Sequence, residues 1–243
     1  MIEVMQQLQN WYQQPLGQMV GHQIRQHLDL CLPKLFGYHL LHLGISEQCG
    51  WLAASPILHR ITLTPEWLPE TNLVASVFEL PLAENSIDLA ILPHTLAFCP
   101  DPNLVLAEVN RVLVPEGHMI FIGFNALSLW GIWRLWRRYT HQAPWNGRFS
   151  SMMSAQRCLR EMGYQITYGV SFFHRPPFQS QKLLNCLEFL ETMGQLSITY
   201  PGGIYLLVAR KKVSTLMPIK PIWRFKNFVL GRRLIQPTTK TSY

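Results

Sequence analysis

His94 is the residue of this sequence whose type and position best suit acid–base chemistry. It follows residues 88–92, a short and almost wholly apolar run that is typical of a strand buried on both faces of a parallel sheet. In α/β sheets ligands bind beyond the carboxyl ends of the strands, and the unperturbed imidazole pKa of about 6.5 suits proton transfer near neutrality. His94 is therefore a candidate general base for an oxygen or carbon nucleophile. The alternative is a structural histidine that hydrogen-bonds the next loop.

The elements that must position His94 lie between residues 80 and 125. A second apolar run, residues 119–122, predicts another buried strand. Between the two strands, Asp101 followed by Pro102 predicts a helix start, because the aspartate can accept an orphan backbone N–H and the proline needs no partner. The apolar stripe of this helix is Val105, Leu106, Val109, Val112 and Leu113, and residues 115–117 are predicted to end it. Strand, helix and strand with short joints indicate a right-handed crossover unit.

Five short motifs in this stretch resemble those of a known family. They are Leu80-Pro81-Leu82, Ser86-Ile87-Asp88, His94-Thr95-Leu96, Asp101-Pro102 and the run RVLVPEG at residues 111–117. Their order and spacing resemble the class I S-adenosylmethionine-dependent methyltransferases of the type 11 subgroup. The resemblance implies an α/β, Rossmann-like methyltransferase fold with a doubly wound, mostly parallel sheet of the seven-stranded type. It also implies S-adenosylmethionine as cofactor and methyl transfer to an acceptor that the sequence does not identify.

The resemblance divides the chain into three parts. Residues 1–37 have helix-like apolar spacings that break near Pro15 and Gly17, and they are expected to form a helical lid over the cofactor pocket. Residues 38–210 are expected to form the methyltransferase-like domain, including a helix at residues 182–193 and a last strand at 204–209. Residues 211–243 are expected to be a basic and flexible C-terminal extension.

The cofactor-binding half departs from the family pattern. Members of the family end the first strand with an acidic residue, one residue, and then glycines at three alternate positions. Here His42 stands at the acidic position, Gly44 at the first glycine, Ser46 at the second and Gln48 at the third. The resemblance also implies that, where the family has carboxylates that hold the ribose and the adenine, this chain has Thr62 and Ser76. The candidate cofactor-binding residues are His42, Gly44, Ser46, Thr62, Leu63, Ser76, Val77 and Pro93.

Two interpretations of this departure remain open. In the first, the pocket still binds the cofactor through backbone groups and neutral hydroxyls, each worth about half a charge-assisted contact. Glu47, Glu66 and Glu79 lie near the missing carboxylates but are offset from the family positions. In the second, the fold persists as a catalytically inactive binding or membrane-peripheral module, since a fold does not fix a function.

A tryptophan- and arginine-rich segment follows, and it resembles an interfacial membrane helix. Its tryptophans are Trp130, Trp133 and Trp136, and its arginines are Arg134, Arg137 and Arg138. Together with the basic tail, they make an anionic membrane surface a candidate partner. The alternative is a helix packed on the sheet with its arginines at the solvent edge. Nucleic acid, bound through the tail, is a less favoured partner than a membrane surface.

Composition and charge exclude several other classes. Five scattered cysteines without a CxxC pair indicate reduced thiols rather than disulfides, and no metal site is expected. The N-terminus lacks the pattern of a secretory signal and no run is long enough to span a bilayer, so a cytoplasmic, or membrane-peripheral, protein is expected. The net charge of +7 belongs to the tail, because residues 210–243 hold nine basic residues and no acid. The rest of the chain has 12 basic and 14 acidic residues.

Overall fold

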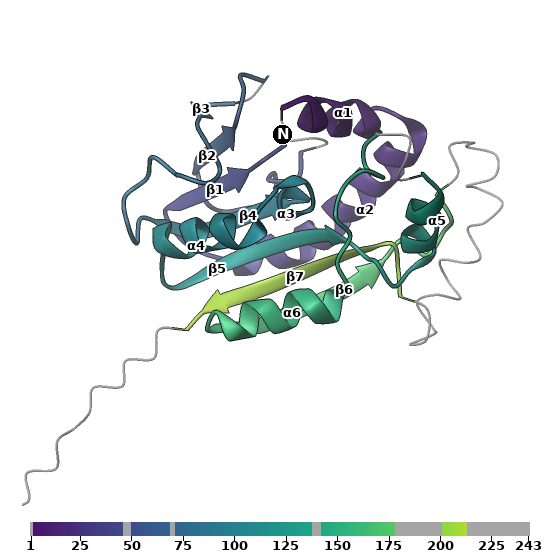
Figure 1. Ribbon diagram of the computed structural model, residues 1–243. Helices are drawn as coiled ribbons and strands as arrows, with labels where there is room; N and C mark the ends of the chain where they lie inside the picture. The colour runs from purple at the N-terminus through teal and green to yellow at the C-terminus, as the bar shows by residue number, and fades with distance from the viewer. Residues whose placement is uncertain (1, 46–49, 69–70, 138–141, 178–200, 213–243) are drawn as a thin grey trace, which may run out of the picture. The chain divides into compact units, whose positions relative to one another are not determined.

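Seven strands form a single sheet in the order β3-β2-β1-β4-β5-β7-β6 (Figure 1). The computed structural model describes residues 2–45, 50–68, 71–137, 142–177 and 201–212. The strands are β1 His39–Leu43, β2 His59–Thr64, β3 Leu73–Val74, β4 Ile87–Pro93, β5 Leu113–Phe124, β6 Tyr164–Phe172 and β7 Ile204–Lys211. Only β7 runs antiparallel to its neighbours β5 and β6. The predicted doubly wound, mostly parallel sheet is therefore confirmed.

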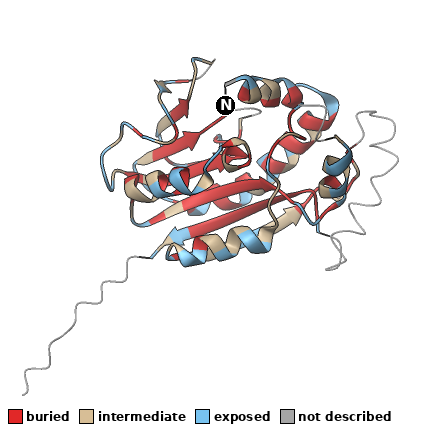
Figure 2. Ribbon diagram, viewed as in Figure 1, coloured by how far each residue is buried: buried red, intermediate tan, exposed pale blue. Residues whose placement is uncertain are grey.

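Helices cover both faces of this sheet. They are α1 Ile2–Tyr12, α2 Pro15–Cys31, the 3₁₀ turn η1 Leu32–Lys34, α3 Thr95–Phe98, α4 Pro102–Val112, α5 Leu129–Arg137 and α6 Met152–Glu161. Helices α1 and α2 supply one core layer and α4 and α6 the other, so the central strands are buried from both sides, as Figure 2 shows. Residues 1–213 form one compact unit, and residues 214–243 form a second unit outside the described ranges. The helix predicted at residues 182–193 also lies outside them.

The first two helices meet at a sharp turn that the sequence encodes. Helix α2 begins at Pro15, which needs no N–H partner at the first helical position. Gly17 follows because a Cβ at this position would collide with the backbone of Trp11 and Tyr12. The predicted break near Pro15 and Gly17 is therefore confirmed. The turn leaves Trp11 and Tyr12 at the end of α1, and both side chains are buried.

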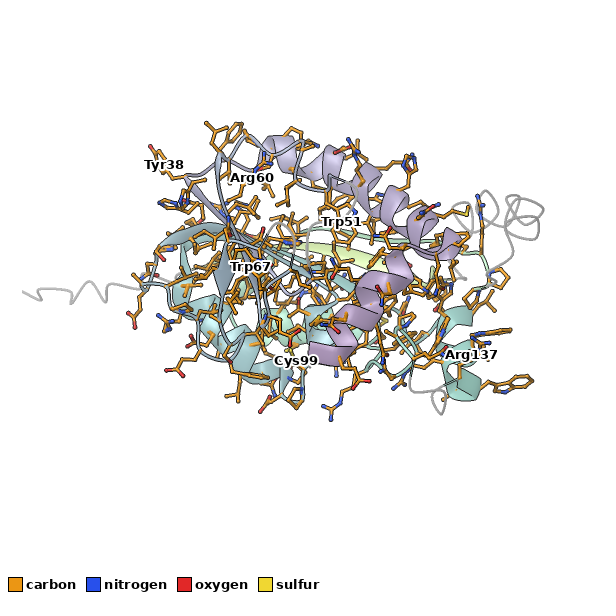
Figure 3. All side chains as sticks on the ribbon, turned by 90° about the horizontal axis from the view of Figure 1, so that it is seen from above. Tyr38, Trp51, Arg60, Trp67, Cys99 and Arg137 are labelled. Atoms are coloured by element: carbon orange, nitrogen blue, oxygen red, sulfur yellow. The ribbon has the colours of Figure 1, made fainter. Side chains whose placement is uncertain are left out.

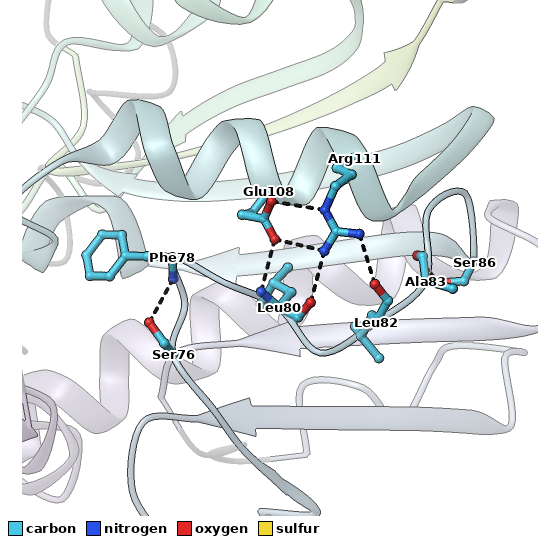
Figure 4. A network of polar contacts seen from close by, with 8 residues as sticks. All are labelled: Ser76, Phe78, Leu80, Leu82, Ala83, Ser86, Glu108 and Arg111. Carbon is cyan, nitrogen blue, oxygen red and sulfur yellow. Dashed lines mark hydrogen bonds and ion pairs between the residues drawn. The ribbon is translucent and has the colours of Figure 1, made fainter.

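Residues of the family motifs between positions 80 and 113 form a network of hydrogen bonds (Figure 4). The Arg111 guanidinium donates to both carboxylate oxygens of Glu108 at 3.0 and 2.8 Å, and to the carbonyls of Leu80 and Leu82 at 2.9 and 3.0 Å. The backbone N–H of Leu80 donates to Glu108. Arg111 accordingly holds the pKa of Glu108 below its usual value. This network fixes the turn before β4 onto helix α4.

Asp88 anchors the start of β1 in a similar way. Its Oδ2 atom accepts hydrogen bonds from the backbone N–H groups of Tyr38 and His39 at 2.8 and 2.9 Å. Asp101 caps α4 as predicted, since its Oδ1 accepts from the N–H of Asn103 at 3.0 Å. Asp88 and Asp101, which belong to the family motifs, therefore stabilise the fold.

The end of helix α4 differs from the prediction. The helix ends at Val112, and Leu113 already begins β5, where it pairs with Ile87. The register then shifts, so that His118 faces Leu89 and residues 114–117 bulge out of the ladder. The prediction that Leu113 belongs to the helix is wrong, because the backbone carbonyls of Arg111 and Val112 are already bound by the turn at residues 85–86.

Candidate functional site

The candidate site lies at the topological switch point between β1 and β4. The chain leaves β1 towards β2 on one side and leaves β4 towards β5 on the other, so a crevice opens beyond the carboxyl ends of these two strands. Two hydrogen bonds join the segments at the base of this crevice. The N–H of Gly44 donates to the carbonyl of Leu63 at 3.0 Å. The hydroxyl of Thr95 donates to the carbonyl of Leu43. This is the usual place for a ligand in such a sheet.

Gly44 is required at this point by two independent constraints. Its φ of +119° is a conformation that residues with a side chain rarely adopt. A Cβ at this position would also lie 2.5 Å from Oγ1 of Thr95, which is too close for any contact. The first glycine of the family motif is therefore required here by the backbone conformation and by the close approach of Thr95. Ser46 and Gln48, which follow it in the motif, lie outside the described residues.

His42 is a fully buried histidine without hydrogen-bond partners in the described part of the chain. Neither Nδ1 nor Nε2 has one, and burial lowers the pKa of the imidazole to about 4. Side chains alternate along a strand, so His42 lies on the same face as Leu40, under the layer that α1 and α2 supply. Most buried polar side chains are paired, and an unpaired one calls for an explanation such as a ligand.

His94 follows β4 in a left-handed conformation, with φ +56°, and it is fully buried. Its Nε2 atom lies 2.7 Å from the hydroxyl oxygen of Tyr12, and its ring stacks on Phe124 at a centroid distance of 4.0 Å. Burial lowers the pKa of His94 to about 3, so the ring is neutral at physiological pH. Nδ1 has no hydrogen-bond partner among the described residues. In this arrangement His94 is a weak base, held by the lid helix rather than by the loop that follows it.

The lid reaches the site through aromatic side chains at the end of α1. Tyr12 packs edge-to-face against Trp51 at 5.3 Å, and Trp11 against Phe124 at 6.3 Å. The indole N–H of Trp51 donates to the carbonyl of Gly21 in α2, and Figure 3 shows Trp51 among the side chains beside the helical layer. The sequence reading did not identify Tyr12 as a site residue. The available signal was the Trp-Tyr pair placed just before a proline break.

The lid also touches the loop that follows β2. The side-chain amide of Gln6 in α1 donates to the carboxylate of Glu66 at 3.0 Å. In the family pattern the end of β2 carries the ribose-binding carboxylate, so this contact brings an acidic group to the neighbourhood of Thr62, four residues away in sequence. Glu66 is thus hydrogen-bonded to α1.

The remaining predicted cofactor residues have different surroundings. Thr62 is buried and faces His42 across the β1–β2 ladder, and its backbone N–H donates to Oδ1 of Asn72 at 2.6 Å. Ser76 is exposed, and its hydroxyl accepts from the N–H of Phe78. Leu63 and Val77 pack in the core layer of α4, and Pro93 is buried at the end of β4. The structure brings His42, Gly44, Thr62, Pro93 and His94 to the switch point, while Ser76 serves a turn after β3.

Comparisons with known proteins agree with the resemblance to a methyltransferase family. Residues 56–121 match the family model of the type 11 methyltransferase domain. This segment is therefore similar to class I methyltransferases of the type 11 subgroup. The whole chain is 29% identical over 215 residues to the protein YafS of Escherichia coli strain K12. The aligned segment covers 86% of this chain and 84% of YafS. A 70-residue segment is 39% identical to the malonyl-[acyl-carrier protein] O-methyltransferase of Alcanivorax borkumensis, covering 29% of this chain and 24% of that enzyme.

The fold of the type 11 domain is also found in solved structures. An S-adenosylmethionine-dependent methyltransferase of Thermotoga maritima superimposes with a TM-score of 0.61 at 19% identity, covering 87% of this chain and all of that one. This similarity concerns the fold. The family and the fold together imply S-adenosylmethionine as the cofactor.

The residues at the switch point supply some of the groups that such a ligand needs. Gly44 lets a ligand approach the backbone closely, and the unpaired nitrogens of His42 offer a buried hydrogen-bonding group. The family carboxylates are absent at His42, Thr62 and Ser76. At these three positions the chain therefore offers neutral groups where the family has carboxylates.

A cavity of about 230 Å³ lies on the other face of the sheet, between α4, α6 and β5. It is lined mainly by apolar side chains, including Leu106, Phe121 and Leu159, and neither His42 nor His94 lines it. Among the described residues, no group of three or more His, Cys, Asp or Glu side chains could hold a metal ion.

Proposed function

We propose that this chain transfers a methyl group from S-adenosylmethionine to an acceptor, in the crevice between the carboxyl ends of β1 and β4. The observation that carries the proposal is the pair formed by Gly44 and His42. One is a backbone position that only glycine satisfies, and the other is a buried imidazole two residues earlier whose two nitrogens have no partner in the described part of the chain. A purely structural strand end would favour an apolar side chain at His42.

The residues that would hold the cofactor are His42, Gly44 and Thr62. When bound, the cofactor supplies an electrophilic methyl group on a sulfonium. Gly44 lets the cofactor approach the backbone closely, as expected at the exit of the first strand. Thr62 faces His42 across the ladder and offers a neutral hydroxyl in place of the family carboxylate. His42 offers one N–H donor and one acceptor nitrogen, because its pKa of about 4 keeps it neutral.

Tyr12 and His94 would exclude water and orient the acceptor. Methyl transfer in this class depends largely on holding acceptor and donor in line, so a strong base is not essential. If Nε2 of His94 accepts from the hydroxyl of Tyr12, Nδ1 carries the proton and can donate to an acceptor oxygen. Action of His94 as a general base would require the lid to withdraw, since a pKa of about 3 makes the buried ring a weak base.

The alternative is a catalytically inactive protein that keeps the methyltransferase fold as a binding module. Two observations favour it: Ser76 hydrogen-bonds its own turn, and Tyr12 closes over His94 in a fully buried contact. The two functions differ in one measurable property, which is affinity for the cofactor.

Isothermal titration of the full chain with S-adenosylmethionine, and with its demethylated product, tests the proposal. We expect a saturable heat and a rise in melting temperature, because a ligand that binds only the folded state stabilises it. The variant His42→Leu should bind at least about tenfold more weakly, since each lost hydrogen bond to a buried partner costs about 1 kcal/mol or more. His22→Leu, at an exposed position on α2, is the matched control. No heat and no thermal shift at millimolar ligand would support the inactive module.

A further inference from the structure

Helix α5 carries its apolar face outward. Within Leu129–Arg137, the exposed side chains are Leu129, Ile132, Leu135 and Trp136. At 100° per residue these four positions fall within an arc of about 120°. Ile132 is 63% exposed and Trp136 is 84% exposed. An amphipathic helix on a globular protein normally turns this face towards the core.

The inward face of the helix explains why the apolar face cannot turn in. Trp130 is fully buried and donates its indole N–H to the carbonyl of Arg175 at 2.9 Å. Its ring packs at 6.0 Å from Phe124 and 6.1 Å from Trp11. The predicted row of three membrane-facing tryptophans is therefore wrong for Trp130, which belongs to the core. Trp133 is only partly buried, and Trp136 points away from the protein.

The segment that contains α5 is basic. Residues 117–160 contain six arginines and no acidic residue. Arg134 and Arg137 are the charged residues of α5; they lie within about 40° of Trp130 around the helix and are half-buried, and Arg134 stacks on the ring of Phe149 at 5.3 Å. Figure 3 shows Arg137 on α5 at the edge of the molecule, on the side away from Tyr38. Arg138 lies outside the described residues, as does the tail, whose sequence adds further basic and aromatic residues.

We propose that the exposed face of α5 docks onto an anionic membrane surface, a role that goes beyond methyl transfer. Leucine, isoleucine and tryptophan side chains on one face of a helix whose charged residues are both arginines suit the boundary between headgroups and acyl chains. Each Lys or Arg near an anionic surface adds about 1 kcal/mol of attraction, so the basic segments complement such lipids. Among the described helices none is both long and apolar enough to cross a membrane, so the contact is peripheral.

The docked face is connected to the candidate site by ring contacts. Trp130 of α5 stacks on Phe124 at 6.0 Å, and Phe124 stacks on His94 at 4.0 Å. A membrane bound at α5 would therefore lie beside the element that borders the crevice. The inference itself does not depend on methyl transfer and can hold for an inactive protein.

Sedimentation of the full chain with lipid vesicles tests this proposal. We expect binding to phosphatidylcholine vesicles that contain phosphatidylglycerol, and at least about tenfold weaker binding to phosphatidylcholine alone. The double variant Ile132→Ser/Trp136→Ser should lose at least about tenfold in binding to the anionic vesicles. The matched control is Leu58→Ser/Trp67→Ser, which removes two exposed apolar side chains, 91% and 75% exposed, from another region.

Two further measurements keep the test decisive. The melting temperature of each variant checks that the fold is intact. Vesicles with brominated acyl chains should quench tryptophan fluorescence of the wild type, and Trp136→Phe should bind as well but lose most of the quenching. Equal binding by the wild type and the α5 double variant would overturn the proposal. So would a change from dimer to monomer in the double variant without vesicle binding by either protein, because the face would then join two copies of the chain.

Discussion

The hydroxyl oxygen of Tyr12 lies 2.7 Å from Nε2 of His94, in a buried hydrogen bond between residues 82 positions apart in the sequence. One partner ends the first lid helix and the other ends the strand at the switch point. The contact ties the lid to the sheet at the place where the acceptor is expected. It therefore ties the N-terminal helices to the sheet.

We expect Tyr12→Phe to lower the stability of the protein. The substitution leaves a buried ring nitrogen of His94 without its partner, which costs about 1–3 kcal/mol. For a domain of this size, the melting temperature should fall by about 2–4 °C per kcal/mol. Tyr38→Phe is the control, because its hydroxyl lies on a side chain that is 82% exposed. Equal melting temperatures for the two variants would show that the bond contributes nothing.

A second expectation concerns the motif arginine of α4. Lysine at Arg111 keeps the charge but cannot reproduce the planar fork that binds Glu108 and the carbonyls of Leu80 and Leu82 together. We expect Arg111→Lys to lower the melting temperature by a few degrees and to increase hydrogen exchange at the N–H of Leu80. Arg157→Lys on α6 tests the same chemical change outside the network. If both variants melt alike, the fork is not what fixes the turn.

Gly44→Ala should destabilise the protein and impair ligand binding together. The added Cβ would lie 2.5 Å from Oγ1 of Thr95 and would also be strained by the φ of +119°. Gly163→Ala separates the two causes, because Gly163 also has a positive φ, +87°, but its added Cβ would have 3.8 Å of space. We expect Gly163→Ala to cost about 1 kcal/mol from backbone strain alone, and Gly44→Ala to cost measurably more. Denaturant titration of both variants gives the difference.

The fold could be predicted from local signals that tertiary structure did not override. The apolar runs at residues 88–92 and 119–122 are the buried cores of β4 and β5, and the Asp101-Pro102 pair starts α4 as its capping chemistry requires. The end of α4 was placed too late, at residues 115–117 instead of Val112, because the bulge of β5 depends on pairing with β4. Such pairing is not visible in a single segment.

The site could be predicted only in outline. Gly44 and His42 could be named as candidates because the family motif marks the exit of the first strand. Tyr12 was missed because its role depends on α1 folding back over β4, a contact between distant parts of the chain. Which face of α5 is buried could not be predicted for a similar reason. Periodicity shows that the helix has two faces, but only the packing of Trp130 shows which face is buried.

The two buried histidines should make stability depend on pH below neutrality. Burial lowers the pKa of His42 to about 4 and that of His94 to about 3, against 6.5 in an unfolded chain. As pH falls below 6.5, the unfolded chain binds protons that the folded chain does not, so the free energy of unfolding decreases. The full stability is present above pH 6.5. At pH 5 the expected loss is about 2 kcal/mol for each histidine, since one pKa unit corresponds to about 1.36 kcal/mol.

His42→Leu isolates one half of this effect. Removing a buried imidazole that has no partner in the described part of the chain should leave stability at pH 7 unchanged or higher. It should also reduce the loss between pH 7 and pH 5 by about 2 kcal/mol, because the remaining slope comes from His94 and other groups. Urea titrations of the wild type, His42→Leu and the exposed-site variant His22→Leu at both pH values measure these differences. Parallel pH profiles for the wild type and His42→Leu would mean that His42 is accessible to protons in the folded state.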